Sequence, residues 1–107
     1  MLLKYDIEID NKAIQNNLMA IINKTYKLLP SREEGLDWEK PLTTLIEELG
    51  GMRRLFVGQQ EPTFFKLLCK MEGLFILSNE EDFILYRRTI FECLSLMNTL
   101  LKNVGIN

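Results

Sequence analysis

The last long stretch of the chain, residues 80–104, most constrains what this sequence can fold into. Apolar residues recur there at alternating steps of three and four: Phe83, Tyr86, Ile90, Cys93, Met97, Leu100 and Val104. This spacing places them on one face of an α-helix, and a helix with such a stripe packs against other helices. The stretch therefore predicts an all-α protein built as a helical bundle.

Residues at both ends of this stretch are typical of helix termini. Ser78 and Glu81 have the spacing of a capping box, and the acidic residues around Glu81 suit the positive end of the helix dipole. Gly105 can adopt the left-handed conformation beyond the last turn, with Ile106 folding back on Leu101. We expect the helix to begin and end at these signals.

A first helix is expected from Asn11 to Leu29, because its apolar residues share one helical face. Asp10 is its best cap residue, and Pro30 ends it. Residues 1–9 alternate between apolar and polar side chains, as a strand does, but several of them also continue the apolar face of the helix. We favour a helix or an irregular lead-in, because a single strand would need a partner strand from another chain.

A charged connector, residues 31–40, follows the first helix and contains the only tryptophan, Trp38. Ser31 and Glu34 have the spacing to cap one short turn within it. Trp38 either fastens the connector to the core or waits for a partner protein, since tryptophan is enriched at interfaces. The first alternative is favoured, and Trp38 is kept as a candidate interface residue.

A second helix begins near Trp38 to Pro41 and stops before Gly58. Gly50 and Gly51 lie inside its apolar stripe, where they cost about 2 kcal/mol relative to alanine. We expect them to kink the helix or to let another backbone approach closely.

A third helix is expected from Pro62 to about Leu77, and it is apolar almost all round. A helix of this kind is buried on most sides, which three neighbouring helices cannot achieve. The excess therefore predicts an interface with a second copy of the chain, with Phe65 and Phe75 as anchors and Trp38 at the rim. The alternative is that residues 30–40 fold over this helix.

Only Ser78 and Asn79 connect the third helix to the fourth, so these two helices form a tight antiparallel hairpin. The hairpin brings Cys69 level with Cys93. Both thiols are expected to be buried and reduced, because both lie in strongly apolar helical stretches. The predicted fold is thus a bundle of four principal helices.

Composition narrows the function classes. The 107 residues suit one domain, residues 1–107. A formal net charge of −2 gives no attraction to nucleic acid or to an anionic membrane, and the absence of histidine removes the commonest general base and zinc ligand. No apolar run is long enough to span a membrane, and the first residues match no signal peptide. We expect a cytoplasmic protein of a bacterial cell or of a phage-infected host.

Pairs of acidic residues raise the question of a metal site. Leu45–Leu49 resembles, in passing, the all-α pyrophosphohydrolases of the MazG type, in which Glu-x-x-Glu and Glu-x-x-Asp pairs on two helices hold magnesium. Glu47 and Glu48 are instead followed three residues later by Gly50 and Gly51. The required spacing is absent, so a solvated acidic face is favoured over a metal site.

Two pairs of basic residues, Arg53–Arg54 and Arg87–Arg88, are the candidate contacts for phosphate groups. In a simple up-and-down bundle the second and fourth helices lie on a diagonal, so the pairs would not form one patch. Ion pairs with neighbouring glutamates are the favoured interpretation of these arginines.

No nucleophile, metal-ligand or phosphate-loop motif is present, so the sequence predicts a protein that is not an enzyme and needs no cofactor. The favoured function is a small protein-interaction module that binds itself as a homodimer, another protein, or both. A phage or mobile-element accessory protein that modulates a host protein is one form of this. The alternatives are a nucleic-acid-associated subunit and, less favoured, an all-α nucleotide pyrophosphohydrolase.

Overall fold

The computed structural model describes residues 4–56 and 58–104, and the side chains of these ranges from Asn11 onward. All regular structure within these ranges is helical, which confirms the predicted all-α bundle. The α-helices are α1 (Lys4–Tyr26), α2 (Leu28–Glu33), α3 (Glu39–Gly51), α4 (Glu61–Gly73) and α5 (Phe83–Asn103). Short 3₁₀ turns join them: η1 (Arg53–Leu55), η2 (Gly58–Gln60), η3 (Leu74–Ile76) and η4 (Glu80–Asp82).

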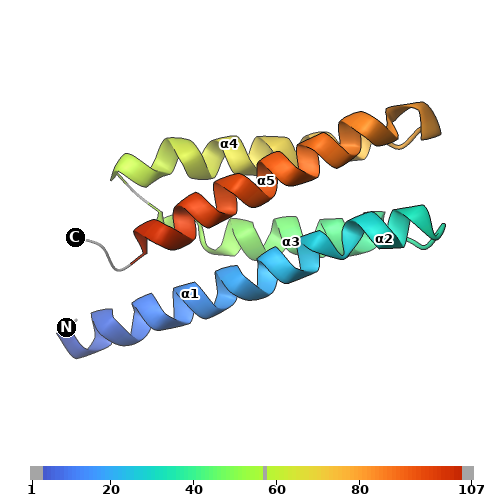
Figure 1. Cartoon of the computed structure of the whole chain (residues 1–107). Coiled ribbons are helices and arrows are strands. Elements are labelled where there is room, and N and C mark those ends of the chain that lie inside the picture. Colours follow the sequence, from blue (N-terminus) through green and yellow to red (C-terminus); the bar gives the residue numbers. More distant parts are fainter. Residues whose placement is uncertain (1–3, 57, 105–107) are drawn as a thin grey trace.

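The four principal helices α1, α3, α4 and α5 form an up-and-down bundle, with α2 extending α1 (Figure 1). The packed neighbours are α1 with α3, α3 with α4, α4 with α5, and α5 with α1. Helices α3 and α5 therefore lie on a diagonal, as the sequence predicted. The tight hairpin between α4 and α5 is also confirmed, since these two helices pack side by side (Figure 1).

The core is one continuous cluster of apolar side chains to which every principal helix contributes. The predicted stripe of α5 supplies its centre, and its fully buried members are Tyr86, Ile90, Cys93, Met97 and Leu100. One polar residue, Thr25, lies within the cluster; its hydroxyl donates a hydrogen bond of 2.8 Å to the carbonyl of Ile21. That bond satisfies the hydroxyl inside the core, so the polar group is tolerated there.

The first helix begins earlier than predicted. Helix α1 already includes residues 4–9, and Asp10 lies inside it rather than at its cap. The strand alternative is therefore wrong for residues 4–9, while residues 1–3 lie outside the described part of the chain. A helix satisfies its backbone hydrogen bonds within one segment, whereas a strand at this position would require a partner strand.

Pro30 does not end the first helix, which was the prediction. Helix α1 ends four residues earlier, at Tyr26, and Pro30 lies in the first turn of α2. A proline ring excludes the carbonyl four residues before it, so the break falls at Tyr26 and not at the proline itself. Ser31 consequently lies inside α2, where its N–H donates to the carbonyl of Lys27 at 3.2 Å, and it caps no turn.

Gly50 and Gly51 neither kink a helix nor admit another backbone, in contrast to the prediction. Helix α3 ends at Gly51, and a Cβ atom added at either glycine would meet nothing within 4 Å. Two successive residues of low helix propensity are enough to end the helix here. Gly58 has a φ of +70°, which a residue with a side chain rarely adopts, and it begins η2.

The start of the last helix differs from the predicted capping box. Neither Asn79 nor Asp82 makes a side-chain cap, and a 3₁₀ turn precedes α5, with the N–H of Asp82 donating to the carbonyl of Asn79 at 3.0 Å. Ser78 is exposed. The predicted glycine cap at Gly105 lies outside the described residues.

Arg32 connects α2 to the turn between α4 and α5 at one end of the bundle. Its guanidinium lies 4.2 Å from the ring centroid of Tyr86 and 5.1 Å from that of Trp38, and the two rings meet edge to face at 5.0 Å. The same guanidinium donates hydrogen bonds to the carbonyls of Leu77 and Asn79, the second at 2.7 Å. Trp38 is 9% exposed, so it fastens the connector to the core, which was the favoured alternative.

Two isoleucines of α5 give a matched test of the bundle. Ile90 is fully buried, whereas Ile84 is 77% exposed. We expect Ile90→Ala to lower the free energy of unfolding by about 2–5 kcal/mol, because it leaves a cavity in the core. Ile84→Ala should change it by less than about 0.5 kcal/mol. Urea denaturation followed by circular dichroism measures both, and equal effects would contradict the orientation of α5.

Arg32 gives a second test. We expect Arg32→Lys to lower the free energy of unfolding by about 2 kcal/mol, because lysine keeps the charge but loses the planar fork and the stacking. Arg54→Lys is the control, since Arg54 is exposed. The fluorescence of Trp38 should shift to longer wavelength in the Arg32 variant alone. An unchanged denaturation midpoint would show that the arginine does not hold this end of the bundle.

Candidate interaction surface

The apolar excess predicted for the third helix is largely covered within a single chain. Phe64, Leu67 and Met71 of α4 are fully buried. Phe64 stacks on Phe56 with the ring centroids 5.1 Å apart, so the segment after α3 covers this side of α4. For most of the helix, the area of apolar surface therefore does not by itself require a second copy of the chain.

The three predicted anchors do not form one surface. Trp38 is buried beside Tyr86. Phe75 packs against the core and is partly buried. Phe65 is 37% exposed, and the guanidinium of Arg53 lies over the face of its ring, 4.7 Å from the centroid.

The two most exposed large apolar residues are Ile76, at the end of the predicted third helix, and Ile84 on α5. Ile76 in η3 is 80% exposed and Ile84 on α5 is 77% exposed, while Leu85 and Phe91 on α5 are about half exposed. Ile84 and Phe91 are seven residues apart, which is two helical turns, so they share the face of α5 opposite the core stripe. The sequence predicted the core positions of this helix, but the exposed positions Ile84 and Phe91 were not predicted. A search for a second apolar repeat would have found the pair.

Two arginines accompany this apolar pair. Phe83, Ile84, Arg87, Arg88 and Phe91 line a depression of about 320 Å³ on α5. The guanidinium of Arg87 lies 5.5 Å from the ring centroid of Phe91. Within the described ranges, neither arginine forms an ion pair, contrary to the favoured interpretation. We call Ile84, Arg87, Arg88 and Phe91 the α5 surface.

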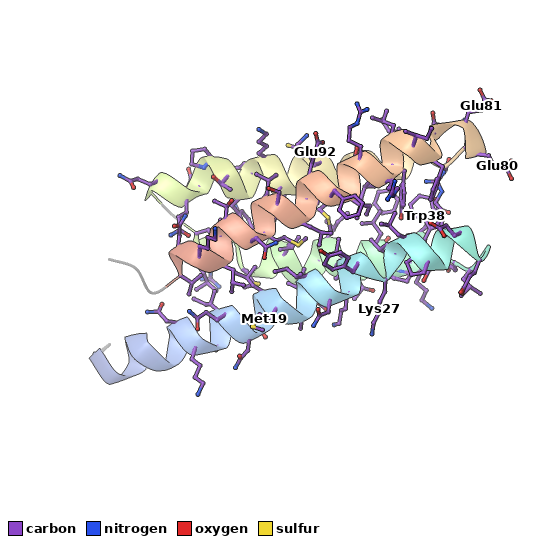
Figure 2. The ribbon with its side chains drawn as sticks, viewed as in Figure 1. Met19, Lys27, Trp38, Glu80, Glu81 and Glu92 are labelled. Carbon is purple, nitrogen blue, oxygen red and sulfur yellow. The ribbon has the colours of Figure 1, made fainter. Side chains whose placement is uncertain are left out.

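Acidic residues lie beside the α5 surface at the end of the bundle. Glu80 and Glu81 are exposed, and both side chains point away from the bundle (Figure 2). Glutamate near a helix N-terminus is stabilised by the helix dipole, which accounts for their presence there. Acidic side chains on η4 are therefore followed along the chain by apolar and then basic side chains on α5.

The two arginine pairs lie at opposite ends of the bundle. Gln60, close in sequence to Arg54, donates a hydrogen bond to the carbonyl of Asn103 at the end of α5. Arg88 precedes Asn103 by 15 residues, roughly 22 Å along a helix. The structure therefore keeps the arginine pairs apart, as the diagonal arrangement predicted.

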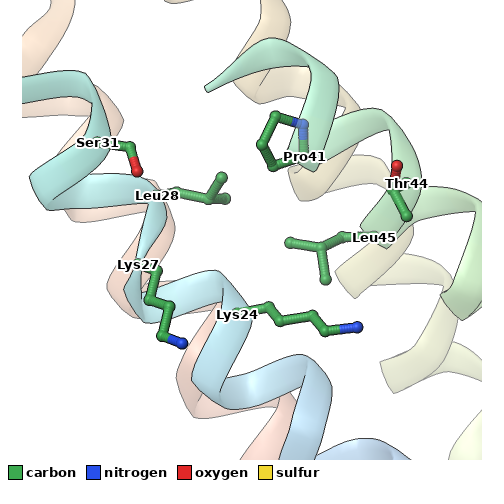
Figure 3. Close-up of a pocket in the computed structure, with 7 residues that line it drawn as sticks. All are labelled: Lys24, Lys27, Leu28, Ser31, Pro41, Thr44 and Leu45. Atoms are coloured by element: carbon green, nitrogen blue, oxygen red, sulfur yellow. The ribbon is translucent and has the colours of Figure 1, made fainter. Parts of the chain in front are cut away.

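A pocket of about 370 Å³ lies between α1–α2 and α3 (Figure 3). Its lining is mostly apolar and consists of Lys24, Lys27, Leu28, Ser31, Pro41, Thr44 and Leu45. The ammonium group of Lys24 pairs with Glu48 at 3.3 Å, and the Thr44 hydroxyl donates to the carbonyl of Lys40 at 3.3 Å. No general base or activated nucleophile is among the lining residues, so the pocket carries no catalytic arrangement.

The acidic pairs stay dispersed. Glu47 is exposed, and Glu48 pairs with Lys24. In the described part of the chain, no three His, Cys, Asp or Glu residues come together in a way that could hold a metal ion. Likewise, no helix within the described ranges is long and apolar enough to cross a membrane.

The two cysteines differ, although both were predicted to be buried. Lys70 and Glu92 form an ion pair of 3.0 Å, which places their sequence neighbours Cys69 and Cys93 at about the same level of the hairpin, as expected. Cys93 is buried, whereas Cys69 is exposed. Burial raises the pKa of the Cys93 thiol to about 12, an effect that Lys70 opposes and Glu92 reinforces.

Comparisons of this chain with protein-family models, with curated proteins and with solved structures find no match.

The different exposure of Cys69 and Cys93 can be tested directly. A thiol reagent at about pH 8 should modify Cys69 rapidly and Cys93 only after unfolding, because a buried thiol with a raised pKa is inert. Mass spectrometry of the native protein should therefore show one label. Cys69→Ser should abolish the fast reaction and Cys93→Ser should preserve it. Two fast labels on the native chain would contradict the position of Cys93.

Proposed function

We propose that this chain is a non-enzymatic protein-interaction module and that it makes contact through the α5 surface. One observation carries the proposal. Ile84 is 77% exposed on a helix whose opposite side is the centre of the core, and Phe91 shares its face. Exposed apolar side chains grouped on one rigid element are typical of sites that another protein covers.

The chemistry of the α5 surface supports the proposal. Arginine and aromatic residues are enriched at protein interfaces, and Arg87 stacks beside Phe91. Helix α5 is held in place by its buried stripe, so little further ordering is needed when a partner binds. A helix presented in this way suits recognition by another helix or by a groove.

The alternatives receive less support. A nucleic-acid role would need basic residues gathered on one face, but the arginine pairs lie at opposite ends and the net charge is −2. For a pyrophosphohydrolase, glutamates would have to converge on a metal ion, whereas Glu47 is exposed and Glu48 pairs with Lys24.

The proposal can be tested by affinity purification of the tagged chain from the cells that produce it, with and without changes in the α5 surface. The tagged chain should retain a protein that is lost with Ile84→Ser/Phe91→Ser, because serine removes the apolar contact at two exposed positions. Any retained protein is then purified and bound again directly to the chain.

The matched control is Met19→Ser/Leu36→Ser, which changes two apolar residues that are 53% and 56% exposed elsewhere. This control should bind as the unmodified chain does. The proposal would be refuted if all three chains retained a protein equally. It would also be refuted if the unmodified chain retained no protein at all, not even a second copy of itself.

A further inference from the structure

We infer that the α5 surface binds a second copy of this chain, with the two α5 helices antiparallel and related by a two-fold axis at Ile84. The inference rests on the proposed function and names the partner. A two-fold interface requires a surface that complements itself, in which residue i meets residue j and j meets i. The order of side chains around Ile84 meets this requirement.

Charges of opposite sign lie at equal distances on the two sides of Ile84. Glu80 precedes it by four residues and Glu81 by three, whereas Arg87 follows it by three and Arg88 by four. All four side chains are exposed. An antiparallel copy centred on Ile84 therefore places the acidic pair of each chain opposite the basic pair of the other.

The helical phase of these residues agrees with the pairing. Glu80 and Glu81 lie in the 3₁₀ turn η4, which advances by about 120° per residue, and Arg87 and Arg88 lie in α5, which advances by about 100°. With these angles, Glu81 and Arg88 fall on one side of Ile84, and Glu80 and Arg87 fall on the other. A two-fold axis that lies in the contact plane, perpendicular to the helices, keeps each side facing its equivalent. Arg88 then meets the Glu81 of the second copy, and Arg87 meets its Glu80. With a rise of about 2.0 Å per residue in η4 and about 1.5 Å in α5, the remaining axial offsets are roughly 1 to 2.5 Å, which long side chains can accommodate.

Ile84 supplies the apolar contact that the charges orient. Exposed ion pairs contribute little each, but opposite charges select the orientation and like charges exclude others. Ile84 meets its own copy at the axis, where its exposed side chain is removed from water. The parallel arrangement would set the arginines against arginines, so only the antiparallel one is favourable.

Charge exchange tests this arrangement on the full chain. One variant, Glu80→Lys/Glu81→Lys, makes the surface basic, and the other, Arg87→Glu/Arg88→Glu, makes it acidic. Sedimentation from about 1 to 500 µM covers the weak affinity expected of a small interface. We expect the unmodified chain to dimerise and each variant alone to dimerise at least about tenfold more weakly, because like charges then face each other.

Mixing the two variants is the decisive measurement. All four charge pairs become attractive in the mixed dimer, so its dissociation constant should return to within about threefold of that of the unmodified chain, and added salt should raise it. Circular dichroism confirms that each variant is folded. No dimer of the unmodified chain at the highest concentration, unchanged dimerisation of either variant alone, or no recovery on mixing would overturn the inference.

This result is independent of the test of the proposed function. If the unmodified chain stays monomeric while another protein is still retained through Ile84 and Phe91, the partner is not a second copy, and the interaction role stands. If neither dimerisation nor the binding of another protein depends on the residues of the α5 surface, both proposals are refuted.

Discussion

A partly buried arginine at one end of the bundle joins the two halves of the chain. Arg32 belongs to α2, yet its guanidinium lies against Tyr86 of α5 and donates to the carbonyls of Leu77 and Asn79 in the turn between α4 and α5. Backbone carbonyls at such a turn have no helical partner and must be satisfied in another way. One planar cation satisfies two of them and stacks on the aromatic ring, so it joins the first half of the chain to the second.

The contact of Arg32 with Tyr86 is also related to which face of α5 is exposed to solvent. With the Tyr86 ring held against Arg32 and Trp38, its side of the helix is fixed toward the core. Burial raises the pKa of the Tyr86 hydroxyl to about 12, and the charge of Arg32 opposes the shift. Ile84 and Arg88 lie two residues to either side and are therefore directed outward. The exposed surface and the buried cluster are two consequences of one helix orientation.

The candidate site was only partly predictable. Arg87 and Arg88 were recognised as a basic pair, and an apolar excess was predicted, but on the third helix. Much of the excess on that helix is covered, because Phe56 stacks on Phe64 and Phe75 packs against the core, but Ile76 at its end is 80% exposed. A helix that is apolar on many sides does not reveal which sides its neighbours will occupy. Ile84 and Phe91 were overlooked because the stronger core stripe of the same helix accounts for most of its apolar residues.

The sequence by itself determined the all-α class, the four principal helices, the hairpin around Ser78–Asn79 and the buried face of α5, since these follow from periodicity and chain connectivity, which are local. Tertiary structure alone decided that Cys69 is exposed while Cys93 is buried, and that Trp38 meets Arg32 and Tyr86. It also brought Glu48 to Lys24 across two helices. The physical reason is that burial depends on how neighbouring helices share the space between them, and a single helix cannot specify that division.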